Sequence, residues 1–304
     1  MRPGAAGRRC TARRARERRH GGTMCRMLGV ISRHCETAEV YRRFRELARG
    51  GEVKPGRDSG HLDGWGVAGY LGRWPVYFDR SPGSVMDEED RYLTAVVKLM
   101  VSKSRFAMVH LRKASAGAVS PANTHPFMAE DWFFGHNGTV LDAGGLPLQQ
   151  HAPAGSTDSE RVFLWLREQV GDAGSDFPVR LGGALAQLRR TTRHTSLTML
   201  LCTPEYFAAF REYSADTAEP GDDPAWNEDY YTLYSARDTD GNALLCSEPM
   251  DLGYDMSGRV HRYRWTPLRN GEMLVLDRDA ATVYRGIIGG EHASAAETTQ
   301  QERT

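Results

Sequence analysis

The chain has 304 residues, of which 40% are hydrophobic and 26% charged, a composition typical of a globular protein that buries a full core. Its longest apolar runs, such as residues 196–202, are far shorter than the ~20 residues of a membrane-spanning helix, so we expect no membrane partner. The five cysteines form no CxxC pair and no zinc-type spacing. This indicates neither a disulfide framework nor a structural metal, and it makes the cytoplasm the expected location.

The first residues carry a large excess of positive charge. Residues 1–23 hold eight arginines against the single acid Glu17, so the rest of the chain has a net charge of −7. Such a segment can be a nucleic-acid-binding arm, an export or organelle signal, or a leader that is absent from the working protein. It lacks the apolar core of an export signal, and no aromatic residue separates the arginines as nucleic-acid binding would favour. We therefore expect neither export nor a nucleic-acid partner, and whether residues 1–24 are a leader depends on evidence from the rest of the chain.

Hydrophobic periodicity then predicts strands and helices that are intermixed, without an internal repeat. The first half contains, in chain order, a strand at 25–33, a helix at 37–49, a hairpin of strands at 65–71 and 74–78, a helix at 87–101, and strands at 106–111 and 131–136 on either side of a polar loop at 112–130. The second half contains helices at 158–170 and 179–190, followed by strands at 196–202, 206–213, 230–236, 243–247, 271–277 and 281–288. This pattern predicts an α+β layered domain over residues 25–290, and the apolar-poor residues 291–304 predict a disordered tail.

Cys25 lies at the start of the first predicted strand, directly after a second methionine, Met24. Most lone cysteines are small buried hydrophobic residues. If translation starts at Met24 and this methionine is removed, however, Cys25 becomes the first residue of the chain. Its α-amino group, with an ordinary pKa of ~8, then lies beside its own thiol and can act as the base. Cys25 is therefore a candidate nucleophile.

Two charged residues are candidates for binding an amino acid. Arg112 ends an apolar strand, where an arginine is either a surface charge or a planar fork that holds a carboxylate. Asp158 lies at a predicted helix start. Ser156 or Asp158 could be the cap of this helix, with Glu160 in its first turn. Alternatively, Asp158 could face a cleft and bind an ammonium group.

The pair Asn137-Gly138 directly follows the predicted strand at 131–136. Asn-Gly is most often the turn of a β-hairpin. An asparagine amide and a glycine N–H held together also form a two-donor site for an oxyanion. The residues alone leave both interpretations open.

The order and spacing of these motifs resemble those of the class II glutamine amidotransferases. The resemblance runs from Met24 to at least Leu166 through MCRMLGV, HLDGWGVAGY, HLRKASAG, NTHPF, HNG and STDSE. Within this class the chain is most similar to the YafJ-like stand-alone proteins, with the ergothioneine-pathway EgtC amidohydrolases as near relatives. The resemblance implies the four-layer αββα sandwich of the N-terminal-nucleophile hydrolases, an α+β fold with antiparallel sheets.

The resemblance also implies a role for each matching residue. Cys25 would be the nucleophile, and Asn137 with Gly138 would form the oxyanion hole. Arg112 would bind the α-carboxylate of glutamine, and Asp158 would bind its α-ammonium group.

Three further features follow from the same comparison. His125 lies in the matching NTHPF motif, where it either contacts the ligand or orders the loop. The stretch HLDGWGVAGY supplies close strand packing. The mature chains of the family begin at the cysteine, whereas 24 residues precede Cys25 here. We therefore expect these residues to be absent or removed, with Met24 as the true start and a processed propeptide as the alternative.

The implied activity is cleavage of the γ-amide of glutamine or of a γ-glutamyl compound through a thioester on Cys25, without a metal or organic cofactor. Ammonia or an amine leaves, and water then releases glutamate. The rest of the sequence shows no P-loop or second dinucleotide-binding unit that could use the ammonia. The protein is then a stand-alone amidohydrolase or a glutaminase subunit that feeds a separate ammonia-accepting synthase. A non-catalytic ligand-binding member of the fold is the third alternative.

Overall fold

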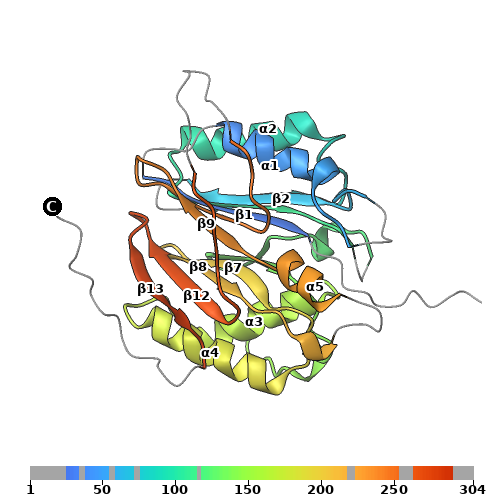
Figure 1. The fold of residues 1–304 in the computed structure, drawn as a ribbon, viewed down its shortest axis with the longest axis vertical. Helices are drawn as coiled ribbons and strands as arrows, with labels where there is room; N and C mark the ends of the chain where they lie inside the picture. Colours follow the sequence, from blue (N-terminus) through green and yellow to red (C-terminus); the bar gives the residue numbers. More distant parts are fainter. Residues whose placement is uncertain are drawn as a thin grey trace, which may run out of the picture.

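The structure is a computed structural model, which describes residues 25–33, 38–54, 59–71, 76–114, 118–217, 223–252 and 263–289. Two antiparallel β-sheets pack face to face, with helices on both outer surfaces (Figure 1). This arrangement confirms the predicted four-layer αββα sandwich. The predicted leader at 1–24 and the predicted tail at 291–304 lie outside the described residues.

The first sheet has seven strands, and its central strands place one side of the functional site. Their spatial order is β11 (Thr266–Pro267), β9 (Tyr234–Arg237), β10 (Ala243–Cys246), β1 (Arg26–Ile31), β4 (Phe106–Leu111), β2 (Trp65–Tyr70) and β3 (Val76–Ser81). β1 and β4 are buried along their whole length, because both faces of the sheet are covered. Their register pairs Arg26 with Leu111, so the start of β1 lies beside the end of β4.

The second sheet has six strands and places the other side of the site. Their order is β13 (Thr282–Ile287), β12 (Glu272–Asp277), β8 (Tyr206–Arg211), β7 (Thr198–Cys202), β6 (Trp132–Asn137) and β5 (Phe127–Ala129). β6 is fully buried and ends at Asn137, which pairs with Thr198 at the start of β7.

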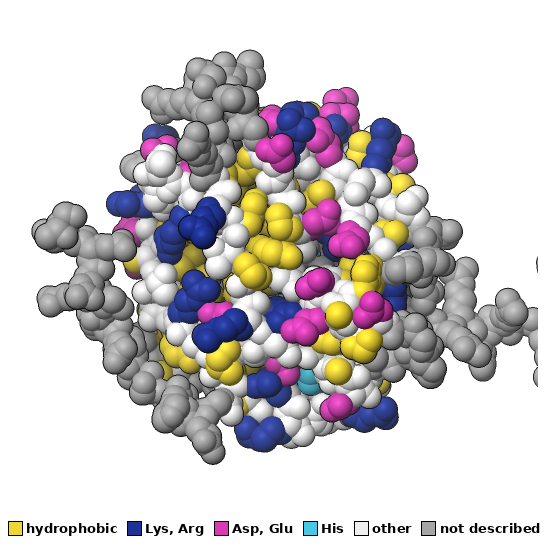
Figure 2. Space-filling view, in the orientation of Figure 1, with side chains coloured by type: hydrophobic (Ala, Val, Ile, Leu, Met, Phe, Trp, Pro, Cys, Tyr) yellow, Lys and Arg dark blue, Asp and Glu magenta, His cyan; other side chains and the backbone are white. Residues whose placement is uncertain are grey.

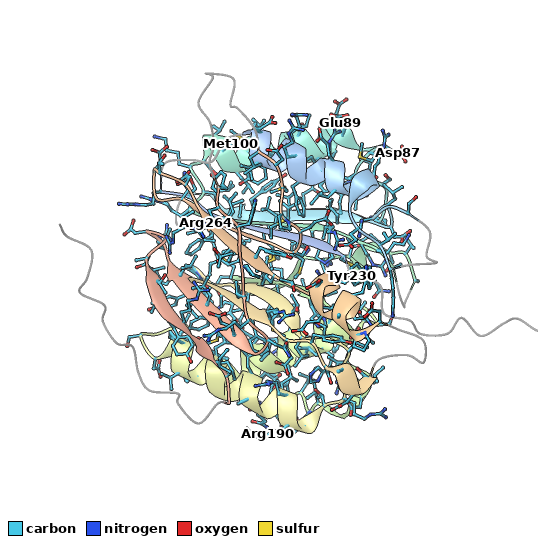
Figure 3. All side chains as sticks on the ribbon, in the orientation of Figure 1. Asp87, Glu89, Met100, Arg190, Tyr230 and Arg264 are labelled. Carbon is cyan, nitrogen blue, oxygen red and sulfur yellow. The ribbon has the colours of Figure 1, made fainter. Side chains whose placement is uncertain are left out.

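The helices cover the outer faces of the two sheets. α1 (Ala38–Gly50) and α2 (Glu89–Val101) cover the first sheet, whereas α3 (Asp158–Val170) and α4 (Phe177–Thr191) cover the second (Figure 1). Apolar side chains fill three layers, one beneath each helix pair and one between the sheets (Figure 3). No helix of the described residues is both long enough and apolar enough to cross a membrane.

The structure corrects the sequence prediction in three places, of which the simplest is the two-residue strand β11, where no strand was predicted. The loop at 112–130 contains the short strand β5, whose three residues are too few for an alternation signal. The predicted strand at 230–236 instead combines the last residue of helix α5 (Pro224–Tyr230) with β9, which begins only at Tyr234. The helix was missed although Asp223 caps it and a proline follows at its first position, a standard start signal.

Candidate active site

One pocket lies where the start of β1 and the end of β4 meet the end of β6 and the start of α3. Its volume is about 240 Å³. All six residues that the sequence predicted for the site line it. The full lining consists of Cys25, Arg112, Lys113, Asn123, His125, His136, Asn137, Gly138, Thr139, Val140, Leu141, Ser156, Thr157, Asp158 and Ser159.

Cys25 directly precedes β1 and is only 8% exposed. Its Sγ accepts a hydrogen bond from the backbone N–H of Lys113 at 3.3 Å, and its thiol can donate to the Lys113 carbonyl at 3.6 Å. Burial is the largest influence on the thiol and raises its pKa to about 11, although the Lys113 backbone and the charge of Arg112 oppose this. The thiol is therefore neutral at pH 7 and needs a base before it can act as a nucleophile.

Arg112 follows the last residue of β4 and is 4% exposed, so the alternative of a surface charge is wrong. The register of β1 and β4 places it beside Cys25. Its Nη1 lies 3.4 Å from the carbonyl oxygen of Asp63, within hydrogen-bonding distance. The side chain also lines the pocket, where a buried guanidinium can bind a carboxylate through two parallel hydrogen bonds.

Asn137 and Gly138 do not form a hairpin turn, because β6 leads into α3 and β7 begins much later in the chain. The Asn137 Nδ2 donates to the carbonyl oxygen of Cys25 at 3.0 Å, and its second N–H makes no hydrogen bond to the described residues. Gly138 has a φ of 134°, and a Cβ there would lie 2.1 Å from the carbonyl oxygen of Ser196, so only glycine fits. The Gly138 N–H donates no hydrogen bond to the described residues. Two donors are thus available beside Cys25.

The loop at 137–141 is held by the segment that precedes β7. The Thr195 N–H donates to the carbonyl oxygen of Thr139 at 2.9 Å, and the Thr139 N–H donates to the Thr195 hydroxyl at 3.0 Å. The Leu141 N–H donates to the carbonyl oxygen of Arg193 at 2.8 Å. The position of both candidate oxyanion donors therefore depends on that segment.

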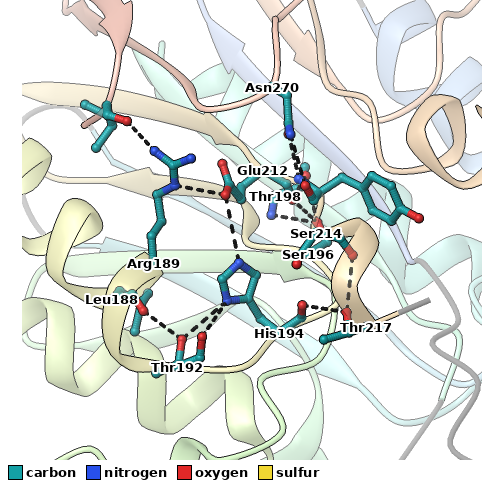
Figure 4. A network of polar contacts seen from close by, with 12 residues as sticks. Leu188, Arg189, Thr192, His194, Ser196, Thr198, Glu212, Ser214, Thr217 and Asn270 are labelled. Carbon is teal, nitrogen blue, oxygen red and sulfur yellow. Dashed lines mark hydrogen bonds and ion pairs between the residues drawn. The ribbon is translucent and has the colours of Figure 1, made fainter. Parts of the chain in front are cut away.

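A buried polar network in turn holds the segment at 192–198 (Figure 4). Glu212 is 6% exposed, and its Oε1 accepts from the Arg189 Nε at 2.9 Å and lies 4.0 Å from the His194 Nε2. The backbone carbonyl of Glu212 accepts from the Ser196 hydroxyl at 2.6 Å. The network thus connects the base of the 137–141 loop to α4 and β8.

Asp158 is the first residue of α3, but neither Asp158 nor Ser156 is its cap. The cap is Thr157, whose hydroxyl accepts from the Glu160 N–H at 3.2 Å, and Glu160 lies in the first turn as predicted. Asp158 instead accepts the Val140 N–H at 2.6 Å with its Oδ2. It thereby fixes the loop after β6 and presents a carboxylate to the pocket.

His125 lines the pocket and stacks on His110, with ring centroids 4.2 Å apart and planes inclined by 14°. His110 belongs to β4 and His125 lies just before β5, so this stack joins the two sheets. Burial lowers the pKa of His110 to about 3 and that of His125 well below its ordinary value, so both rings are neutral at pH 7. The backbone of His136 counteracts part of the effect on His110. None of the four ring nitrogens makes a hydrogen bond of normal geometry to the described residues.

His136 is a third buried histidine of the pocket, directly before Asn137. Its Nε2 lies 3.1 Å from the carbonyl oxygen of Ser196, and its Nδ1 lies 2.9 Å from the Ser159 hydroxyl. A carbonyl can only accept, so Nε2 carries the proton and Nδ1 accepts from Ser159. Burial lowers the pKa of His136, which keeps this neutral tautomer in place.

Sequence reasoning missed Asn123, although it is the first residue of the NTHPF motif. Its Nδ2 donates to the carbonyl oxygen of Ala118 at 3.1 Å, and its Oδ1 accepts the Ser156 N–H at 2.8 Å. Asn123 therefore ties the loop that carries His125 to the loop that leads into α3. Within the described part of the chain, no three His, Cys, Asp or Glu residues are grouped so that they could hold a metal ion.

The chain belongs to the class II glutamine amidotransferases. The family model with the description "Glutamine amidotransferases class-II" matches residues 24–298. The matched region begins one residue before Cys25 and contains every residue that lines the pocket.

Three curated proteins are similar over part of their length. YafJ, a candidate glutamine amidotransferase of Escherichia coli K12, is 32% identical over 154 residues, which are 48% of this chain and 55% of YafJ. A candidate glutamine amidotransferase of Haemophilus influenzae is 32% identical over 48% of both chains. The uncharacterized protein MJ1515 of Methanocaldococcus jannaschii is 38% identical over 38% of this chain and 32% of its own. The chain thus aligns with about half or less of each relative.

Solved structures support the fold. Glutamine phosphoribosylpyrophosphate amidotransferase from Bacillus subtilis matches with a TM-score of 0.57 at 15% identity, over 88% of this chain and 50% of that enzyme. A glutamine aminotransferase class-II domain protein from Silicibacter pomeroyi matches with a TM-score of 0.52 at 21% identity, over 87% of this chain and 99% of that one. At these identities the likeness establishes the shared architecture.

Proposed function

We propose that this protein hydrolyses the side-chain amide of glutamine, or the γ-amide of another γ-glutamyl compound, with Cys25 as the nucleophile. The observation that carries the proposal is the convergence of three kinds of group in one pocket of a class II amidotransferase fold. These groups are a thiol, a pair of hydrogen-bond donors at Asn137 and Gly138, and an oppositely charged pair at Arg112 and Asp158. Together they match the parts of an α-amino acid with a side-chain amide.

The proposed working form begins at Cys25. The thiol is held neutral by burial, which raises its pKa to about 11, and its only hydrogen bonds to the described residues go to the backbone of Lys113. While Met24 is attached, the Cys25 nitrogen is an amide and cannot accept a proton. Once Met24 is absent, this nitrogen is an amine with an ordinary pKa of ~8 that takes the thiol proton directly or through a water. Initiation at Met24 followed by its removal is the route we favour over processing of a longer leader.

The reaction would then proceed through a thioester. The Cys25 thiolate attacks the γ-carbonyl carbon, and the developing oxyanion accepts hydrogen bonds from the Asn137 amide and the Gly138 N–H, each worth ~3–4 kcal/mol in comparable sites. Collapse breaks the C–N bond, and the leaving nitrogen takes the proton from the Cys25 α-ammonium group. Water, deprotonated by the same amine, attacks the thioester, releases glutamate and restores the thiol.

The charged residues would hold the amino-acid end of the substrate. We assign the α-carboxylate to Arg112, whose planar fork suits it, and the α-ammonium group to Asp158. We assign His125 to the same end of the pocket, because its buried ring nitrogens have no hydrogen-bond partner among the described residues. No metal or organic cofactor is needed in this scheme.

The test is turnover by purified protein that begins at Cys25, with a Cys25→Ala variant as the matched control. Glutamine and several γ-glutamyl amides are supplied in turn, and the release of ammonia or amine and of glutamate is measured. Rapid turnover of one substrate by the unmodified protein alone would support an amidohydrolase. Slow glutamine turnover that rises on addition of an ammonia-accepting synthase would identify a glutaminase subunit. Binding without turnover would show a non-catalytic member of the fold and refute the proposal.

A further inference from the structure

A second pocket lies where β9 and β11 of the first sheet face β12 and β13 of the second. Its volume is about 240 Å³, equal to that of the active-site pocket, and the two share no lining residue. Three arginines line it, namely Arg237, Arg264 and Arg285, and no acidic side chain of the described residues does. In Figure 2, dark blue side chains gather on the side of the molecule where Figure 1 draws β9, β12 and β13, and Figure 3 labels Arg264 there.

The strand register shows that arginines extend from the inner faces of both sheets. Arg237 pairs with Ala243, and Arg285 pairs with Leu274. Residues directly opposite one another on antiparallel strands project from the same face. Ala243 and Leu274 both belong to the apolar layer between the sheets. At this edge of the sandwich, the inner faces of the two sheets therefore carry arginines instead of apolar side chains.

The positive charge of the pocket is only partly compensated. Arg285 Nε donates to Glu272 at 2.7 Å, whereas among the described residues Arg237 donates only to the hydroxyl of Thr282, at 3.1 Å. Arg264 makes no hydrogen bond or ion pair within the part of the chain that the structure describes. Three guanidinium groups therefore face one cavity with a single directly paired carboxylate.

The charge of Arg285 also acts on Arg237. Burial is the largest influence and lowers the pKa of Arg237, the nearby charge of Asp277 opposes this, and the charge of Arg285 lowers the pKa by a smaller amount. Two like charges that extend from opposite sheets repel one another, and an anion between them would turn this repulsion into attraction.

We propose that this pocket binds a small organic phosphate. A phosphate offers three terminal oxygens and close to two negative charges, which matches three convergent guanidinium forks better than a carboxylate with two oxygens does. The buried side chains of Leu274 and Leu276 form part of the apolar floor, on which the carbon body of the ligand rests. The site is independent of the proposed amidase activity.

Calorimetric titration of the full chain with phenyl phosphate tests the proposal. We expect saturable binding that Arg264→Gln and Arg237→Gln each weaken about tenfold, the ordinary effect of one charge-assisted hydrogen bond. Arg264→Gln removes no hydrogen bond or ion pair between described residues, so its effect on binding reports mainly on the ligand. Arg42→Gln on α1 is the matched control, because Arg42 is also exposed and is paired with carboxylates. Its affinity should equal that of the unmodified protein.

Titrations with other ligands and variants identify which chemical group binds and in which pocket. Weaker binding of inorganic phosphate and of benzoate than of phenyl phosphate supports an organic phosphate. Equal binding of all three ligands overturns that assignment. Absence of saturable binding, or an equal loss in Arg42→Gln, overturns the site itself. A loss of binding in Arg112→Gln together with unchanged binding in Arg264→Gln would place the phosphate in the active-site pocket and likewise overturn the proposal.

Discussion

The two halves of the active-site pocket are held in place by different kinds of contact. In the half built on the first sheet, Cys25 and Arg112 are neighbours because β1 and β4 pair through a continuous backbone ladder. In the half built on the second sheet, Asn137 and Gly138 leave the end of β6, and the loop they begin depends on contacts with the segment that precedes β7. Part of that support comes from side chains, because the Ser196 hydroxyl donates to the backbone carbonyl of Glu212 and the buried Glu212 carboxylate accepts from Arg189.

This difference determines how each half should respond to mutation. A backbone ladder does not depend on the identity of any one side chain. Substitutions in the first half should therefore lower activity without changing the geometry of the pocket. When one member of a buried polar network is changed, the positions of the others change as well. Substitutions in the network behind the second half should therefore reduce turnover although these residues do not contact the substrate.

Cys25→Ser should abolish most turnover, with a loss on the order of a thousandfold or more in kcat/KM, because a hydroxyl is far less ionised than a thiol. The melting temperature should stay close to that of the unmodified protein. Cys246→Ala, which changes a buried cysteine of the same sheet, is the control that should keep its activity. Near-normal turnover by the Cys25→Ser protein would show that Cys25 is not the nucleophile.

Asn137→Asp should lower kcat by roughly a hundredfold to a thousandfold, because it replaces one oxyanion donor by a negative acceptor of the same size. Steady-state kinetics separate this from a binding effect, since KM should change much less than kcat. Asn137 also donates to the Cys25 carbonyl, so reactivity of the thiol with a small alkylating reagent should be measured alongside. A rise in KM alone would show that Asn137 contacts the substrate without stabilising the transition state.

Arg112→Lys should raise the KM for glutamine by about tenfold or more, because it keeps the charge but loses the bidentate fork. The effect on kcat should be smaller. A γ-glutamyl analogue that lacks the α-carboxylate provides the control, since it should react equally with the variant and the unmodified protein. An unchanged KM for glutamine would contradict the assignment of Arg112 to the carboxylate.

Glu212→Gln should reduce kcat by roughly threefold to tenfold with little change in KM, because it weakens the charge-assisted contacts behind the 137–141 loop. Glu46→Gln on α1 removes an exposed ion-paired carboxylate and should change neither parameter. Glu212→Asp should restore part of the lost kcat. Equal kinetics of Glu212→Gln and Glu46→Gln would show that the network is structural only.

The histidine stack between the two halves should make stability depend on pH. Burial lowers the pKa of His110 to about 3, below the ~6.5 of an unfolded histidine, so the unfolded chain binds more protons between these values. The free energy of unfolding should therefore fall as the pH decreases from about 6.5, by at most ~1.4 kcal/mol per pH unit for this histidine. Urea unfolding at pH 7 and pH 5 should show a smaller difference for His110→Phe. An identical difference would contradict the shifted pKa.

The sequence predicted the first half of the site more completely than the second. The buried runs of β1 and β4 are recognisable from composition, but the two strands are far apart in the sequence, so only the family resemblance placed Cys25 and Arg112 in one site, and their register is seen only in the structure. The family motifs placed Asn137, Gly138 and Asp158 in the same pocket, but the hairpin and helix-cap alternatives were resolved only by the structure.

The contacts that support the second half could not be predicted from the sequence. No periodic pattern links Glu212, Arg189 and His194, which lie directly after β8, in α4 and in the loop between α4 and β7, respectively. Asn123 stood in a recognised motif, yet its bond to the loop before α3 depends on how two loops fold against each other. Such contacts are set by three-dimensional packing rather than by local sequence.

Both halves of the pocket provide groups that would act on a substrate attacked by the Cys25 thiol. Treatment of protein that begins at Cys25 with a diazo-ketone analogue of glutamine, followed by peptide mass spectrometry, tests this most directly. We expect a single adduct on Cys25 that excess glutamate prevents, with the buried Cys202 and Cys246 unmodified. Labelling of another cysteine at an equal rate, or full activity without an adduct on Cys25, would contradict it.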